Sequence, residues 1–342
     1  MRDTHVDFLG RRKTFYIIAC CAIVLCLLGI FGRHLSMGID FTGGRTYVVR
    51  FDQDVNVVDV RASLAQEFEE APEVKSYGPN NQVKITTNIV ASDYFEAYRT
   101  AHNLAATDTI TDEMVINEKL FAGTKKYFSN SEIGHDITME EFSNADTYPY
   151  GIIQSEQVEA TMATDMKRSS ILAVIGGLLV IFAYIGIRFK SWRFGVGSIV
   201  ALTHDTILII GIFALLRGLM PFSLDVDQSF IAAVLTIIGY SINATVVIFD
   251  RVRENRTLYP KRTLMQHMND AINATLARTI NTSGTTFFTL LMMFIFGGEV
   301  IRGFIFALLV GVVCGMFSSV CLACPVVYEV SKRREEKKAL KD

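Results

Sequence analysis

Cysteine is absent from the polar part of this sequence. The six cysteines all lie inside long apolar runs: Cys20, Cys21, Cys26, Cys314, Cys321 and Cys324. This placement excludes a disulfide framework or a cysteine zinc site in an aqueous domain. We interpret these cysteines as small apolar residues of membrane-embedded segments.

An excess of charge of either sign is also absent. Lysine and arginine number 33 and aspartate and glutamate 35, which gives a formal net charge of -2. Net charge therefore gives no indication of a nucleic-acid partner, and we expect none. In a chain this apolar, the sidedness of the charges is more informative than their sum.

The usual signatures of catalysis are missing too. The glycine pair Gly43-Gly44 is not followed by the Lys-Ser/Thr of a phosphate-binding loop. The sequence has no Ser-His-Asp arrangement typical of hydrolases and no cluster with the spacing of metal ligands. We therefore expect no enzymatic activity, no metal and no cofactor.

Long apolar runs dominate what is present. Half of the 342 residues are hydrophobic, and six runs with few charges are each about as long as a bilayer requires. The first run resembles a signal peptide, but no small-residue cleavage site follows it, so we expect it to be retained. The sequence predicts a polytopic α-helical membrane protein with six transmembrane helices, at residues 14–31, 169–187, 194–216, 228–249, 279–298 and 303–328.

Basic residues predict the orientation of these helices. Arg11, Arg12 and Lys13 precede the first run, and further groups of lysine and arginine follow the second, fourth and sixth runs. Because basic residues favour the cytoplasmic side, we expect both ends of the chain in the cytoplasm, as residues 1–13 and 329–342. We also expect residues 263–277 to form an amphipathic helix at the cytoplasmic surface.

Residues 32–168 form a polar segment between the first two runs, long enough to fold as a domain. The pattern predicts a strand at 45–51, a helix at 54–70, a hairpin of 74–77 with 82–86, and a helix at 92–104, with the remainder irregular. This succession indicates a small α+β domain, which we expect on the periplasmic side. Its glycine-rich opening predicts turns at Gly38, Asp40, Gly43 and Gly44.

The fourth apolar run contains the most informative stretch. Ser241, Asn243 and Thr245 place hydrogen-bonding groups at membrane depth, where they either join neighbouring helices or line a wet cavity. The run ends in a charged motif, where we expect the helix to meet water. This motif comprises Asp250, Arg251, Arg253, Glu254 and Asn255.

Ionisable residues within the apolar runs are costly to bury and therefore informative. His204 and Asp205 lie near the middle of the third run, and two interpretations are open: a structural hydrogen-bond network or a proton relay. Arg278 lies at the start of the fifth run, where it is either a snorkelling anchor or a functional charge.

Four motifs together resemble one known family. They are Gly38-Ile39-Asp40-Phe41-Thr42-Gly43-Gly44, the stretch from Gly239 to Asn255, Arg278-Thr279-Ile280-Asn281-Thr282-Ser283, and Gly297-Gly298-Glu299-Val300-Ile301-Arg302. The chain is similar to the SecF family of protein-export membrane subunits, or to the SecF half of a fused SecDF, in the resistance-nodulation-division superfamily. The resemblance covers nearly the whole chain.

The resemblance implies an auxiliary subunit of the Sec preprotein translocase in the bacterial inner membrane, multi-pass, with its large loop in the periplasm. The implied partners are SecD (separate or fused), the SecYEG channel, YajC or YidC, unfolded preprotein and membrane lipid. The implied mechanism couples proton flow to motions of the periplasmic domain that promote late-stage export. Two alternatives are a small-molecule or lipid exporter of the same superfamily and a structural scaffold of the translocon.

One residue departs from the family pattern. The family places an aspartate directly after Asn243 and an arginine where Arg278 stands, but this chain has Ala244 at the aspartate position. A methyl group cannot carry a proton, so we expect this form to be uncoupled or coupled through other groups. The sequence leaves open whether the alanine is natural, and whether protons or sodium ions are used. The candidate coupling residues are His204, Asp205, Ser241, Asn243, Ala244, Thr245 and Arg278.

Overall fold

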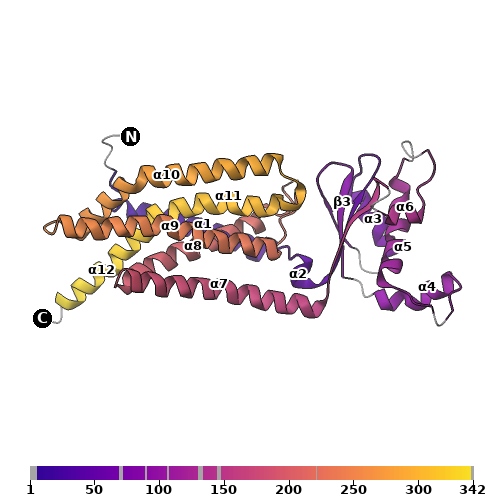
Figure 1. Cartoon of the computed structure of the whole chain (residues 1–342), viewed down its shortest axis with the longest axis horizontal. Coiled ribbons are helices and arrows are strands. Elements are labelled where there is room, and N and C mark those ends of the chain that lie inside the picture. The colour runs from indigo at the N-terminus through magenta and orange to yellow at the C-terminus, as the bar shows by residue number, and fades with distance from the viewer. Residues whose placement is uncertain are drawn as a thin grey trace. The chain divides into compact units, whose positions relative to one another are not determined.

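The computed structural model describes residues 6–68, 72–88, 91–105, 108–129, 134–144, 148–220 and 222–339. Residues 1–5 and 340–342 of the predicted cytoplasmic ends lie outside the described residues. The chain divides into two compact units (Figure 1). A helix bundle comprises Met1–Ser36, Arg168–Arg217 and Leu224–Asp342, and an α+β domain comprises Met37–Lys167 and Gly218–Ser223.

Six helical segments of the described chain are long and apolar enough to cross a membrane. The first five are α1 (Arg12–Arg33), α7 (Ala160–Arg188), α8 (Trp192–Leu216), α9 (Gln228–Leu258) and α10 (Leu264–Phe296). The sixth combines α11 (Glu299–Ser318), a π-helical turn η3 (Ser319–Ala323) and α12 (Cys324–Ala339). The prediction of a polytopic helical membrane protein with six spans and an α+β domain after the first is confirmed.

Several helices differ from their predicted bounds. The predicted amphipathic helix at 263–277 and the span at 279–298 form one continuous helix, α10, which begins with a capping box between Thr263 and Gln266. No glycine or proline interrupts its first five turns, so nothing in the backbone ends the helix at Arg278. Helix α7 begins at Ala160, within the segment predicted to belong to the polar domain.

Small residues bring α9 and α11 close together. A Cβ atom built on Gly311 would lie 2.4 Å from Cγ1 of Ile237, and one on Gly315 would lie 3.0 Å from Oγ of Ser241. Gly311 and Gly315 are four residues apart, as are their partners, so the same faces meet over successive turns. This spacing of small residues is typical of closely packed membrane helices.

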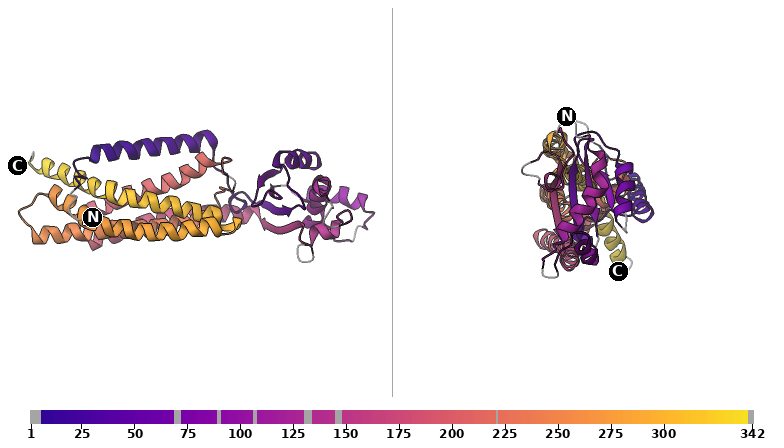
Figure 2. Two further views of the ribbon diagram at one scale, coloured as in Figure 1. Left: turned by 90° about the horizontal axis from the view of Figure 1, so that it is seen from above. Right: turned by 90° about the vertical axis from the view of Figure 1, so that its right-hand side faces the viewer.

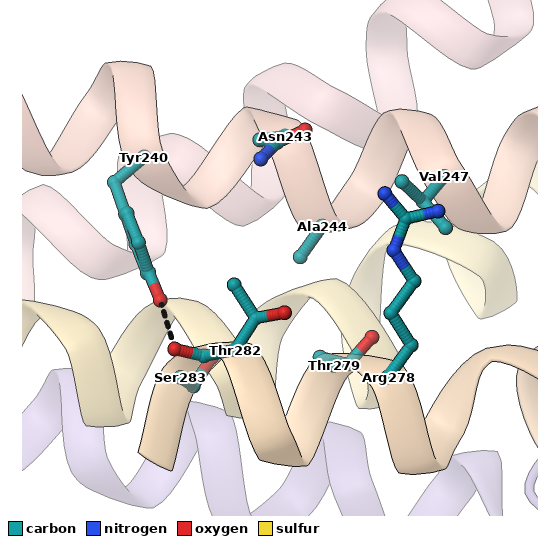
Figure 3. A pocket seen from close by; sticks show the side chains of 8 residues that line it. All are labelled: Tyr240, Asn243, Ala244, Val247, Arg278, Thr279, Thr282 and Ser283. Carbon is teal, nitrogen blue, oxygen red and sulfur yellow. Dashed lines mark hydrogen bonds between the residues drawn. The ribbon is translucent and has the colours of Figure 1, made fainter. Parts of the chain in front are cut away.

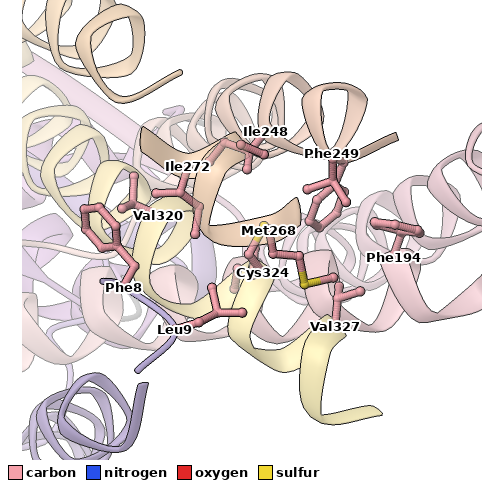
Figure 4. Packing of buried hydrophobic residues seen from close by; sticks show 14 of the residues in the cluster. Phe8, Leu9, Phe194, Ile248, Phe249, Met268, Ile272, Val320, Cys324 and Val327 are labelled. Carbon is pink, nitrogen blue, oxygen red and sulfur yellow. The ribbon is translucent and has the colours of Figure 1, made fainter. Parts of the chain in front are cut away.

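A large apolar cluster occupies the end of the bundle where α9 leaves its apolar stretch (Figure 4). Phe8 and Leu9, from the segment before α1, pack there with residues of α8, α9, α10 and α12. Asn269 fixes this segment, because its Oδ1 accepts a 2.8 Å hydrogen bond from the backbone N–H of Phe8. Asn273 does the same for Val6, through bonds of 2.9 and 2.8 Å to its N–H and carbonyl.

The α+β domain is built on an antiparallel sheet whose described strands have the order β2-β3-β1-β4 (Figures 1 and 2). The strands are β1 (Gly44–Arg50), β2 (Glu73–Ser76), β3 (Gln82–Thr87) and β4 (Gly151–Val158). The predicted strand and hairpin are therefore confirmed, with Val49 opposite Val83 in the β1–β3 register. The helices and helical turns of the domain are α2 (Ile39–Thr42), α3 (Val57–Glu67), η1 (Ala91–Tyr94), α4 (Phe95–Ala101), α5 (Asp112–Thr124), η2 (Lys125–Tyr127) and α6 (Met139–Ser143).

The expectation that the rest of this domain is irregular was wrong. Helix α5 supplies Ile116 and Leu120 to the domain core, where they join Tyr47, Val49 and Leu64. Strand β4 escaped detection because only its first two residues are buried, so its sequence has no alternation of apolar and polar residues.

Candidate functional site

Asp205 lies at the centre of a buried polar network in the helix bundle. Its carboxylate is 1% exposed, and one oxygen, Oδ2, accepts hydrogen bonds from the hydroxyls of Ser241 at 2.9 Å and Ser318 at 2.7 Å. The other oxygen, Oδ1, lies 3.1 Å from Nδ1 of His204. These four side chains connect α8, α9 and α11, so three helices meet at one carboxylate.

A second layer of hydroxyls continues the network from α9 to η3. Thr245 donates a 3.0 Å hydrogen bond to Oγ of Ser319, and Ser319 donates a 3.2 Å bond to the backbone carbonyl of Ser241. Both hydroxyl-bearing residues are almost completely buried. The π-helical turn begins at Ser319, directly after Ser318, and such turns are frequent at functional sites.

The two ring nitrogens of His204 differ in their surroundings. Its imidazole is 3% exposed and faces the ring of Phe317, with ring centroids 5.8 Å apart. Nε2 has no hydrogen-bond partner among the described residues. Nδ1 thus lies beside the Asp205 carboxylate, and Nε2 stays available for a further hydrogen bond.

The other candidate coupling residues, Asn243 and Ala244 of α9 and Arg278 of α10, lie apart from this network. Ala244 and Asn243 line a small pocket between α9 and α10, together with Tyr240, Val247 and Arg278 (Figure 3). The pocket has a volume of about 50 Å³. Figure 3 shows the Arg278 side chain extending from α10 towards Val247, while the methyl group of Ala244 points into the space between the helices.

Hydroxyl groups of α10 complete this pocket. Thr279, Thr282 and Ser283 line its α10 side. Tyr240 donates a hydrogen bond of 3.2 Å to the carbonyl of Thr282, which ties α9 to α10. Arg278 is exposed within the single chain and forms no ion pair with a described residue. The pocket therefore pairs a cation with neutral donors and a methyl group.

The structure thus separates the candidate coupling residues into two groups on two faces of α9. Ser241 and Thr245, four residues apart, face α8, α11 and η3. Asn243 and Ala244 border the pocket that contains Arg278. Helical spacing places Ser241 and Thr245 on one face, but only the tertiary structure shows which helices each face of α9 meets.

The charged motif at the end of α9 forms local ion pairs and an anchor. Asp250 pairs with Arg188 of α7 at 3.3 Å, and Arg251 pairs with Glu254 at 2.7 Å. Asn255 is 3% exposed and donates a 3.2 Å hydrogen bond to the carbonyl of His267 in α10. Arg253 is exposed. In this structure the motif holds the end of α9 against its neighbours.

The glycine-rich opening of the domain forms a tight turn. Gly38 precedes α2, Asp40 lies in its first turn, and Gly43 and Gly44 follow with φ of 74° and 116°. A Cβ atom on Gly44 would lie 2.7 Å from the carbonyl oxygen of Thr87 in β3. The glycine pair is therefore required by backbone geometry.

Sequence reasoning missed Ser318 and Ser319, although a signal was available. Gly311, Gly315 and Ser319 recur at intervals of four residues in the last apolar run. That spacing of small residues predicts a helix-contact face, and Ser318 lies beside it.

Comparison with known proteins adds an independent observation. The family model "Protein export membrane protein SecD/SecF, C-terminal" matches residues 138–333, and the "SecD/SecF GG Motif" matches residues 28–55. The protein translocase subunit SecF of Rhodothermus marinus is 38% identical over 99% of this chain and 97% of its own length. The chain belongs to the SecF family. SecF of Koribacter versatilis is 32% identical, over 95% of this chain and 92% of its own length.

Solved structures agree with this assignment. SecDF of Thermus thermophilus, described as a translocon-associated membrane protein, superposes with a TM-score of 0.75 at 27% identity over 96% of this SecF-family chain. SecDF in a super-membrane-facing form superposes with a TM-score of 0.61 over the whole chain. This chain spans 39% and 41% of those two SecDF chains, respectively.

Proposed function

We propose that this SecF-family chain acts with SecD beside the SecYEG channel and couples proton flow to movements of its α+β domain. These movements promote late-stage export of unfolded preproteins, and the chain itself carries out no enzymatic reaction. The α+β domain lies in the periplasm and both ends of the chain in the cytoplasm, across the bacterial inner membrane. The distribution of basic residues supports this orientation, and the likeness to fused SecDF chains supports SecD as a partner.

The buried carboxylate of Asp205 is the observation that carries the coupling proposal. Asp205 is the only buried acidic residue among those that the structure describes. An ionised carboxylate only accepts hydrogen bonds, whereas a protonated one also donates. A proton on Oδ2 would compete with the hydroxyls of Ser241 and Ser318 for that oxygen, which would change the contacts of α9 and α11 with α8.

Ala244 is the reason that the proposal assigns the proton to Asp205. The family's aspartate position holds a methyl group here, so the pocket beside Arg278 has no proton carrier on α9. We assign the carrier role to Asp205, with His204 as the group that exchanges protons with it. Arg278, which belongs to α10, supplies a fixed positive charge next to the opposite face of α9.

The test is preprotein export driven by the proton-motive force in membrane vesicles that contain the native chain or Asp205→Asn, each with SecD. The amide keeps the shape of the side chain but cannot exchange a proton, so we expect loss of the proton-driven fraction of export. Asp270→Asn is the matched control, because this carboxylate pairs with Arg262 at 2.7 Å near the start of α10. Unchanged proton-driven export by Asp205→Asn would exclude Asp205 as the carrier.

Introducing Ala244→Asp provides a second arm. If Asp205 is the carrier, Ala244→Asp alone leaves proton-driven export near the native level. Recovery of export in Asp205→Asn/Ala244→Asp would show that either position can carry the proton. A large gain from Ala244→Asp in the native background would instead identify the native chain as a disabled form and refute the assignment to Asp205.

A further inference from the structure

A second pocket lies at the end of the bundle where α8 begins and α9 ends. Its volume is about 310 Å³, which is about ten times the 30 Å³ that one water molecule occupies in the liquid. Phe194, Met268 and Val327 form its apolar wall and belong to the large buried cluster shown in Figure 4. This pocket is separate from the Asp205 network and from the pocket beside Arg278.

The polar side of the pocket is basic. Arg193, Arg256 and Arg262 line it, from α8, α9 and the turn before α10. Arg262 is paired with Asp270 at 2.7 Å and stacked on Tyr259 at 4.2 Å. Its position is therefore fixed from two sides, and part of its charge is neutralised.

The other two arginines have no acidic partner among the described residues. Arg193 is half-buried, and its Nε is a buried donor without a hydrogen bond to any described group. Arg256 is exposed and lies in the last turn of α9. Two guanidinium groups that converge on one pocket without a carboxylate make it strongly attractive to an anion.

Two buried polar side chains also line this pocket. His267 is 4% exposed, and its Nδ1 has no hydrogen-bond partner among the described residues. Ser331 is 3% exposed and also lines the pocket. Buried polar groups are normally paired, so the unpartnered Nδ1 of His267 is consistent with a ligand that completes its hydrogen bond.

We propose that this pocket binds a phosphate group, supplied by the headgroup of an anionic phospholipid. Phosphate oxygens match the fork of donors on each guanidinium, and the apolar wall suits the glycerol and first methylenes of the lipid. The pocket lies at the charged end of α9, next to the last residues of its apolar run, and basic pockets between helices near a membrane surface are suited to such lipids. The inference does not depend on proton coupling.

The chain's one tryptophan provides a direct probe, because Trp192 stands between the pocket residues Ser191 and Arg193. The experiment titrates the purified full chain in detergent with dioctanoyl phosphatidylglycerol and follows tryptophan fluorescence. We expect a saturable change with this lipid and a much weaker one with dioctanoyl phosphatidylcholine, whose choline is repelled by the arginines. Inorganic phosphate forms a third titration.

The variant Arg193→Gln/Arg256→Gln should bind the anionic lipid about a hundredfold more weakly, because each guanidinium that bonds the phosphate contributes about a tenfold gain. Arg253→Gln/Lys261→Gln removes the same charge from exposed positions outside the pocket and should bind like the native chain. Arg256→Gln alone changes an exposed side chain, so it keeps the fold and should bind about tenfold more weakly.

The outcomes separate the sources of the phosphate. Saturation by phosphatidylglycerol alone supports a lipid headgroup, and equal saturation by inorganic phosphate supports a phosphate site filled from solution. The proposal is overturned if neither ligand saturates the native chain. It is also overturned if the two double variants bind equally, since attraction would then come from surface charge in general.

Discussion

The hydroxyl of Ser318 tests whether Asp205 organises the bundle as a charged acceptor. Ser318→Ala removes a 2.7 Å hydrogen bond to a carboxylate that is 1% exposed. A bond to a charged group contributes about 2 kcal/mol, whereas neutral side-chain bonds between membrane helices contribute about 0.6 kcal/mol. We therefore expect Ser318→Ala to destabilise the chain by about 2 kcal/mol.

Ser198→Ala is the matched control for this substitution. Ser198 is as completely buried as Ser318, but its hydroxyl donates only to the carbonyl of Phe194 in its own helix, at 3.0 Å. Its loss should cost less than about 1 kcal/mol. The assay is thermal unfolding of the purified chain, in which about 2 kcal/mol lowers the midpoint by about 3 °C for a chain of 342 residues.

A double-mutant cycle checks the physical reason. In the Asp205→Asn background the acceptor is neutral, so Ser318→Ala should cost only about 0.6 kcal/mol. An equal loss in both backgrounds would refute a charged acceptor at position 205. An equal loss from Ser318→Ala and Ser198→Ala would show that burial alone sets the cost.

Three further predictions concern the fold. Gly311→Ala should destabilise the chain by about 1–3 kcal/mol, because its Cβ would lie 2.4 Å from a side chain of α9. The control Gly239→Ala should not destabilise the chain, because its Cβ meets nothing within 4 Å. Thermal unfolding compares the two variants. Gly44→Ala should destabilise the α+β domain, since φ is 116° and its Cβ would meet the β3 backbone; protease resistance of the domain in the full chain measures this. The backbone N–H of Thr138, followed by His135, lowers the pKa of Glu141 from its ordinary 4.5. Its contribution to stability is therefore present above that value and lost as the pH falls through the lowered folded-state pKa. Circular dichroism during acid titration should show a weaker pH dependence below about 4.5 in Glu141→Gln.

The structure also changes the interpretation of two predicted motifs. The charged end of α9 and the glycine pair before β1 are both accounted for by structural contacts. Asn255 ties α9 to α10, and Gly44 allows a close approach to β3. No residue of either motif lines the two pockets described above, although Arg256, which follows Asn255, lines the second pocket. Asn255 and Gly44 therefore hold helices and strands in place.

The spans and the family could be predicted from the sequence because each depends on local patterns. A run of apolar residues as long as a bilayer is thick is a one-dimensional property, and so is a motif such as Gly239 to Asn255. The continuous α10 was harder to predict, since its first part is amphipathic and its second part apolar. Hydropathy alone therefore predicts two separate helices where the backbone forms one. Strand β4 was missed because its burial is set by β1 beside it.

The sequence by itself determined that the chain crosses a membrane six times, that an α+β domain follows the first span, and that polar groups sit among the spans. Only the tertiary structure decided which of those groups meet. It joined Asp205 to Ser318, more than a hundred residues away, and placed Ala244 on the opposite face of α9, towards Arg278. The physical reason is that the sequence of one helix fixes only the order and spacing of its own residues. Which residues meet across two helices depends on how closely the backbones approach, and small residues on the facing sides set that distance.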